Sequence, residues 1–203
     1  SGDILIDGGA FDGSSGSMFK KFGCEVYSFE LDEKNFQNAK SRGDREGFVV
    51  ENFGLGEHAR QIQYCSNDFG SAVGNFKVSE DKKKIGQLIS IDEYVRDKNL
   101  PRIDFIKLDV EGSELETLKG ATISIARFKP RLAISAYHKT EDLWTLQQFL
   151  KSIRPDYEFA FRHFETTFDS APYMFNDLVV EYCNLFDLPM RYPGLGEFVL
   201  FAR

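Results

Sequence analysis

Short apolar runs alternate along this chain with stretches in which apolar residues recur every three or four positions. The runs that we interpret as buried strands cover residues 3–7, 26–30, 48–50, 103–109 and 132–138. After the last of them, a helical face is formed by Leu143, Leu146, Leu150 and Ile153. Strands that alternate with helices favour parallel strands joined by right-handed crossovers. The pattern therefore predicts an α/β fold with a doubly wound, Rossmann-like sheet.

Two parts of the chain depart from this rhythm. Residues 57–91 are interpreted as a small excursion beside the sheet that contains its own pair of strands, followed by a short helix capped by Asp92. Near the end, we prefer residues 198–201 to residues 178–180 as the last strand. Residues 165–197 then form an insertion over the ligand face, where substrate selection is expected. We treat residues 1–203 as a single domain.

The first strand leads into a glycine-rich turn. Asp7 is followed by Gly8, Gly9, Ala10, Phe11, Asp12 and Gly13. Beyond the turn, Ser14, Ser15 or Ser17 is expected to cap a helix that buries Met18, Phe19 and Phe22. Backbone N–H groups in a strand–turn–helix unit can face a nucleotide-like ligand, and glycine allows the ligand a close approach.

Glu30 ends the second strand, where an acidic residue commonly binds the ribose hydroxyls of an adenosine ligand. Together, loop and acid favour a cofactor site over an ordinary βα turn. The loop has the pattern D-x-G-x-x-x-G and lacks the G-x-G-x-x-G fingerprint of dinucleotide-binding proteins. An NAD(P)-dependent oxidoreductase is therefore an alternative that the loop disfavours. A Rossmann-like binding module without catalytic activity is a second alternative.

Asp109 and Glu111 follow a buried strand, at the edge where open α/β sheets bind ligands. The alternative is that Glu111 and Glu114 are ordinary acids of a helix N-terminus. Both Asp109 and Glu111 could hold Mg²⁺, but no other acid is clearly placed to complete a site, so no metal site is predicted.

His138 follows the fifth strand on the same rim and is the predicted general base. His163 is the competing candidate. The alternative role for His138 is structural, with a hydrogen bond to Asp142 or to the backbone. Asp109 is the next choice as base.

Composition excludes several classes of protein. The chain has 203 residues and a formal net charge of −7, which disfavours a nucleic-acid partner. No apolar run is long enough for a membrane span, and three scattered cysteines suit a reducing cytoplasm. Because the first strand begins at once, we expect upstream residues to be missing and Ser1-Gly2 to be an expression remnant. The oligomeric state is open.

The chain resembles FkbM-type methyltransferases, a class I family dependent on S-adenosylmethionine. The matching segments are residues 7–13, 29–32, 54–56 and 106–114, with weaker agreement at 91–94 and 118–121. The resemblance implies a seven-stranded sheet with an antiparallel last strand and methyl transfer to a hydroxyl of a glycan sugar or small-molecule metabolite.

The same resemblance implies roles for individual residues. The residues expected along the cofactor are Asp7, Gly8, Gly9, Ala10, Phe11, Gly13, Glu30, Leu31, Gly54, Leu55 and Asp109. Leu31 would pack on the adenine, and Asp109 would lie beside the sulfonium. Leu31 also stands where the family commonly has proline. The predicted catalytic residues are His138, Asp109 and Glu111.

Overall fold

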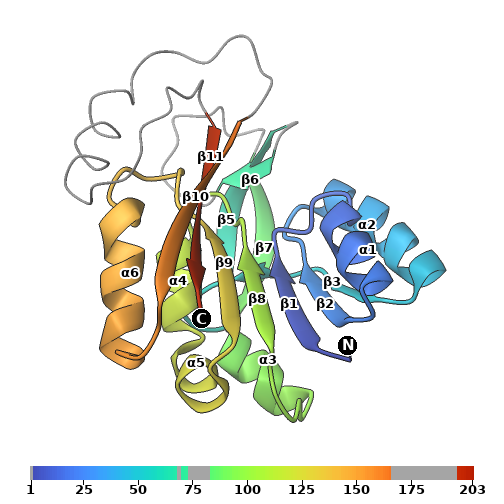
Figure 1. Cartoon of the computed structure of the whole chain (residues 1–203). Coiled ribbons are helices and arrows are strands. Elements are labelled where there is room, and N and C mark those ends of the chain that lie inside the picture. The colour runs from blue at the N-terminus through green and yellow to red at the C-terminus, as the bar shows by residue number, and fades with distance from the viewer. Residues whose placement is uncertain (1, 68–69, 73–82, 166–195) are drawn as a thin grey trace.

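A seven-stranded sheet forms the centre of the protein, which we describe from a computed structural model (Figure 1). The structure describes residues 2–67, 70–72, 83–165 and 196–203. The strand order is β10-β11-β9-β8-β1-β2-β3, and β11 alone runs antiparallel to its neighbours. The predicted doubly wound sheet with an antiparallel last strand is therefore confirmed. The insertion predicted at residues 165–197 falls almost entirely outside the described residues.

The strands of this sheet are β1 (Ile4–Gly8), β2 (Glu25–Phe29), β3 (Val49–Glu51), β8 (Phe105–Leu108), β9 (Arg131–Ser135), β10 (Phe159–Glu165) and β11 (Gly196–Ala202). The helices are α1 (Ser14–Lys21), α2 (Glu33–Glu46), α3 (Ile91–Asp97), α4 (Glu114–Lys119), α5 (Thr122–Phe128) and α6 (Asp142–Ile153). Among the described residues, no helix is long and apolar enough to cross a membrane.

Successive residues of a strand point to opposite sides of the sheet, and both sides are covered by other elements, so apolar residues are buried on both faces. On one side, Leu5 and Val26 pack with Ala39 of α2 and Phe48. On the other, a larger core joins Ile6, Ile106 and Ile134 of three neighbouring strands to residues of α3, α4, α5 and α6. Helices α1 and α2 lie together beside the β1–β3 half of the sheet in Figure 1.

A second, smaller sheet has the order β4-β7-β5-β6. It contains β4 (Gly54–Leu55), β5 (Arg60–Asn67), β6 (Gly70–Ala72) and β7 (Lys83–Ile89). The antiparallel pairing of β5 with β7 confirms the predicted excursion. The Gly54–Leu55 segment is a short strand that pairs parallel with β7.

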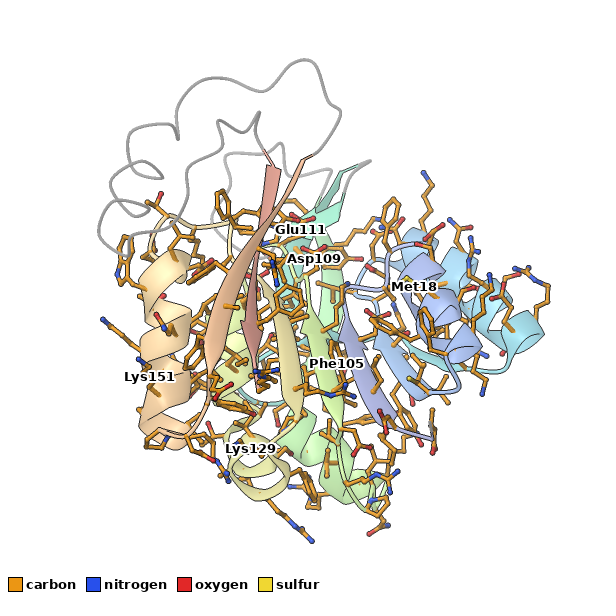
Figure 2. The ribbon with its side chains drawn as sticks, in the orientation of Figure 1. Met18, Phe105, Asp109, Glu111, Lys129 and Lys151 are labelled. Atoms are coloured by element: carbon orange, nitrogen blue, oxygen red, sulfur yellow. The ribbon has the colours of Figure 1, made fainter. Side chains whose placement is uncertain are left out.

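The prediction for the buried side of α1 is wrong for two of its three residues. Met18, which Figure 2 labels on α1, is 49% exposed. Phe22 is 70% exposed, whereas Phe19 packs against the core. Helix α1 lies so close to the sheet that its buried side consists of small residues. A Cβ at Gly16 would lie 2.7 Å from the ring of Phe48. The N-cap is Gly13, and no serine side chain caps the helix.

Two further capping predictions are corrected. Helix α3 begins at a capping box formed by Ser90 and Glu93, not at Asp92. The Asp92 carboxylate instead accepts hydrogen bonds from the backbone N–H groups of Ile123 and Ser124 in the first turn of α5. These two hydrogen bonds join the start of α3 to the start of α5.

Candidate active site

The glycine loop after β1 is held against the end of β8. The backbone N–H of Asp109 donates to the carbonyl of Gly8 at 3.1 Å. Gly9 has φ +78°, and a Cβ there would lie 1.9 Å from the Asp109 carbonyl oxygen. Gly13 has φ +80° and would place a Cβ 3.0 Å from the backbone of Ala39. Contacts within the protein therefore require glycine at positions 9 and 13.

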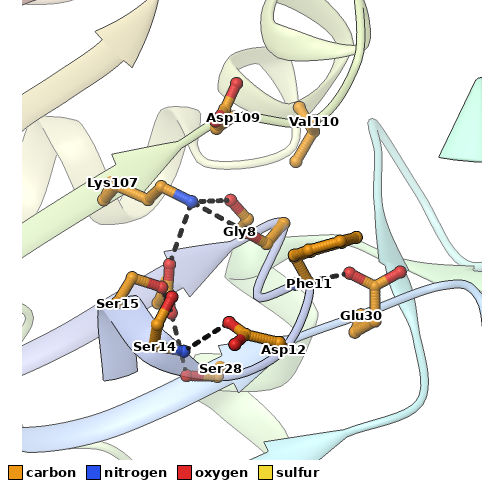
Figure 3. Close-up of polar contacts among 12 residues, drawn as sticks. Gly8, Phe11, Asp12, Ser14, Ser15, Ser28, Glu30, Lys107, Asp109 and Val110 are labelled. Carbon is orange, nitrogen blue, oxygen red and sulfur yellow. Dashed lines mark hydrogen bonds and ion pairs between the residues drawn. The ribbon is translucent and has the colours of Figure 1, made fainter. Parts of the chain in front are cut away.

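An ion pair between Lys107 and the buried Asp7 holds the glycine loop in place (Figure 3). The Asp7 carboxylate is fully buried and accepts hydrogen bonds from the hydroxyls of Ser15 (2.7 Å) and Ser28 (3.0 Å). Lys107 Nζ lies 3.2 Å from Asp7 Oδ1 and donates to the carbonyls of Gly8 (3.1 Å) and Gly9 (2.8 Å). These contacts fix the backbone path of the loop, and the predicted contact of Asp7 with a cofactor stays a prediction.

Glu30 connects the loop to the end of β2. Its Oε2 accepts a hydrogen bond from the Phe11 N–H, and its Oε1 accepts one from the Asp32 N–H, both at 2.8 Å. Burial raises the pKa of Glu30 above its ordinary value, although these backbone donors oppose the shift. Each carboxylate oxygen has a further lone pair that a ribose hydroxyl could use. Phe11, which has φ 50°, is 47% exposed beside it.

Three further residues expected along the cofactor, Leu31, Leu55 and Ala10, are buried. Leu55 is buried and contacts the loop, since a Cβ at Gly8 would lie 2.9 Å from Leu55 Cδ1. Leu31 is 8% exposed and lies over Gly54, where an added Cβ would be 3.4 Å from Leu31 Cδ1. Leu55 therefore lies against the glycine loop, and Leu31 lies against β4.

The three predicted catalytic residues converge at the ends of β8 and β9, which are parallel neighbours. His138 Nε2 lies 3.4 Å from Glu111 Oε2 and 3.7 Å from Asp109 Oδ1. The carboxylates of Asp109 and Glu111 are partly exposed, at 32% and 42%, and Figure 2 shows both residues at the same end of the sheet. Glu111 has φ 53°, a conformation that costs energy in a non-glycine residue and that is found at functional sites.

Two partners of these residues were not predicted. Glu114 is fully buried, and its Oε1 lies 2.8 Å from His138 Nδ1 and 3.0 Å from the Val110 N–H that donates to it. The Tyr137 hydroxyl donates to Asp109 Oδ1 at 2.9 Å. We call Asp109, Glu111, Glu114, Tyr137 and His138 the rim cluster. Burial disfavours the imidazolium, but the neighbouring carboxylates prevail and raise the pKa of His138.

Sequence offered a signal for only some of the missed residues. Lys107 is a lysine inside an apolar strand, which indicates a buried ionic partner. Glu114 looked like an ordinary acid of a helix N-terminus, and its burial follows from tertiary packing. The predicted competitor His163 lies in β10, paired with Phe198, and its side chain is outside the described part of the structure. The other alternative for His138, a bond to Asp142, is replaced by the contact with Glu114.

The glycine loop after β1, the acid after β2 and the polar cluster after β8 and β9 all lie at the carboxyl edge of a doubly wound sheet, which is the edge where such folds bind ligands. Residues 7–171 match the family model of the methyltransferase FkbM domain. The chain therefore belongs to the FkbM methyltransferase family. The resemblance seen in its sequence is confirmed.

Three known proteins show the extent of the similarity. The hexuronic acid methyltransferase AglP of Haloferax volcanii is 32% identical over 122 residues, which cover 59% of this chain and 50% of that protein. The structure of methyltransferase FkbM from Methylobacillus flagellatus KT aligns with a TM-score of 0.67 and 26% identity, over 99% of this chain and 43% of the other. An rRNA methylase from Streptococcus thermophilus shares the fold, with a TM-score of 0.54, 14% identity, and coverage of 99% and 86%. The chain thus spans about half the length of its FkbM-type relatives.

Proposed function

We propose that this domain transfers a methyl group from S-adenosylmethionine to a hydroxyl of a sugar or glycan. The observation that carries the proposal is the double contact of Asp109. Its backbone lies against Gly8 and Gly9 of the glycine loop, and its carboxylate belongs to the rim cluster. One residue therefore connects the expected cofactor side of the site to the expected acceptor side.

S-adenosylmethionine supplies a methyl group that is already activated on a sulfonium. The protein's contribution is to bind the acceptor hydroxyl in line with that group and to take up its proton. Glu30 suits the ribose hydroxyls because its buried carboxylate retains acceptor capacity. Asp109, Glu111 and His138 suit the acceptor because their polar atoms meet at a partly exposed edge.

The acceptor class is supported by the relative that is named for methylation of a hexuronic acid. A sugar presents several hydroxyls, and carboxylates such as those of Asp109 and Glu111 accept hydrogen bonds from them. Family membership disfavours the NAD(P)-dependent alternative. A domain that binds the cofactor without turnover is the remaining competitor, and only a measured reaction separates it from an enzyme.

Calorimetry with S-adenosylmethionine and with NAD tests the cofactor, and mass spectrometry of uronic acid and neutral sugar glycosides tests the reaction. We expect binding of S-adenosylmethionine alone and a gain of one methyl group in a glycoside. Binding of NAD in place of S-adenosylmethionine would contradict the proposal. Cofactor binding without methylation of any glycoside would favour the binding module.

A further inference from the structure

Three polar side chains of the rim cluster converge more closely than their hydrogen bonds explain. Asp109, Glu114 and His138 each place one potential ligand atom so that all three atoms lie within 4.8 Å of one another. Glu114 comes from the first turn of α4, Asp109 from the end of β8, and His138 from the segment after β9. Separate elements therefore bring two carboxylates and an imidazole to one point.

Buried atoms in this group lack hydrogen-bond partners. The Glu114 side chain is fully buried, yet its Oε2 has no hydrogen bond within the described part of the chain. The same is true of both ring nitrogens of His138, whose side chain is 10% exposed. His138 Nδ1 lies 2.8 Å from Glu114 Oε1, but the two atoms do not meet hydrogen-bond geometry. A buried polar atom without a partner destabilises the folded state, so the arrangement calls for another partner.

A metal ion accounts for the short contact between His138 and Glu114. Around an ion that holds its ligands at about 2.0–2.2 Å, adjacent ligand atoms are about 3 Å apart. The 2.8 Å between His138 Nδ1 and Glu114 Oε1 is close to that value. Two adjacent ligands point toward the ion and not toward each other, which explains a short contact without a hydrogen bond.

The outer contacts also resemble those of a metal centre. The Tyr137 hydroxyl donates to Asp109 Oδ1, and the Val110 N–H donates to Glu114 Oε1. Donors of this kind orient carboxylate ligands and are a regular part of metal sites. Asp109 is 32% exposed, so the ligand atoms can be reached from the edge of the sheet.

We infer that Asp109, Glu114 and His138 bind one divalent cation at the rim of the candidate active site. A mixed set of carboxylate oxygen and imidazole nitrogen suits Mn²⁺ or Zn²⁺ better than the Mg²⁺ considered for Asp109 and Glu111 alone. Three protein ligands leave positions for oxygen atoms of an acceptor. The role of this cation in catalysis rests on the proposed function. His138 is then a metal ligand and not the predicted general base, because a bound cation itself lowers the pKa of a coordinated hydroxyl.

Binding of the metal ion can be tested without measuring methyl transfer. After EDTA treatment and dialysis, the whole chain is titrated with Mn²⁺ by electron paramagnetic resonance and with Zn²⁺ by calorimetry. We expect one ion per chain and a metal-dependent rise in the unfolding temperature. Glu114→Gln, Asp109→Asn and His138→Ala should each weaken binding at least tenfold. Glu116→Gln is the matched control, because it makes the same change two residues further along α4, where the side chain is partly exposed and pairs with Lys119.

The inference is overturned if neither ion binds stoichiometrically, or if binding survives both Glu114→Gln and His138→Ala. Asp109→Asn guards against a folding artefact in Glu114→Gln, since Asp109 is partly exposed. The metal site and the proposed function fail separately. Methyl transfer by protein that binds no ion rejects the site alone, whereas ion binding without methyl transfer to any glycoside rejects the function alone.

Discussion

Lys107 and Asp7 form an ion pair beneath the glycine loop, with Lys107 Nζ 3.2 Å from Asp7 Oδ1. The same ammonium donates to the carbonyls of Gly8 and Gly9. Lys107 therefore connects β8 to the glycine loop through the side chain of Asp7 and through the backbone of Gly8 and Gly9. Because the Asp7 side chain is fully buried, removing the ammonium would leave a buried carboxylate without its cation.

Lys107→Met should lower the free energy of unfolding by about 1–3 kcal/mol, since it leaves the buried Asp7 carboxylate without its cation and two carbonyls without their donor. Urea unfolding measures the change. Lys40→Met is the control, because Lys40 pairs with Asp44 on the exposed side of α2 and such pairs contribute about 0–1 kcal/mol. Equal losses in the two variants would contradict a structural role for the buried pair.

Gly9→Ala should disrupt the loop more than its backbone conformation alone explains. Gly9 and Gly47 have nearly the same φ, +78° and +81°, but a Cβ at Gly9 meets the Asp109 carbonyl at 1.9 Å, whereas one at Gly47 has only Lys20 Cε at 3.7 Å. Gly47→Ala should therefore cost about 1–2 kcal/mol of stability, and Gly9→Ala more. We also expect at least a tenfold loss of S-adenosylmethionine affinity by calorimetry for Gly9→Ala alone. Similar results for the two variants would mean that the loop can move away from Asp109.

Glu30→Ala should weaken S-adenosylmethionine binding about tenfold or more, because a charge-assisted hydrogen bond contributes roughly 1.5–3 kcal/mol. The variant also removes the acceptor of the Phe11 and Asp32 N–H groups, so its unfolding curve must be recorded beside the calorimetry. Wild-type affinity in the folded variant would show that the ribose is bound elsewhere.

Glu30 also gives a prediction for the pH dependence of stability. Its pKa is raised from an ordinary value of 4.5, mainly by burial, so the folded state holds the proton more tightly than the unfolded chain does. The contribution of Glu30 to the free energy of unfolding must then fall as the pH rises from about 4.5 through the raised pKa. Above the raised pKa this contribution stays constant. Glu30→Gln cannot ionise and should remove this fall. Urea unfolding at several pH values checks it, and an unchanged slope in the variant would mean that other groups set the dependence.

Much of the fold follows from the sequence because strand and helix signals are local. Apolar runs such as residues 103–108 predict strands, and the parallel topology then places Asp109 and His138 on one edge. What could not be predicted depends on how elements approach each other. Met18 and Phe22 have helical spacing but lie on the exposed side of α1, because Gly16 allows the helix to approach Phe48 closely.

The same limit applies to the candidate site. Its residues at strand ends were predicted because their position follows from the order of elements along the chain. Glu114 was not, since a glutamate in the first turn of a helix is usually exposed, and only the three-dimensional structure shows it buried against His138. The backbone bonds of Glu30 were equally invisible, because they depend on the path of the loop 19 residues earlier.

His138→Ala should lower kcat of the proposed methyl transfer by about 10²–10⁴-fold and leave S-adenosylmethionine affinity close to wild type. The reason is positional: His138 contacts Asp109, Glu111 and Glu114, whereas the expected ribose side of the site lies at Glu30. The loss is expected whether His138 takes up the proton or binds a cation.

His58→Ala is the matched control, since His58 is an exposed imidazole in a turn before β5 and should change neither quantity. Steady-state kinetics and calorimetry on the two variants decide the matter. A fall in kcat of less than about fivefold for His138→Ala would remove His138 from the chemical step, and a parallel loss of cofactor affinity would place it on the cofactor side of the site.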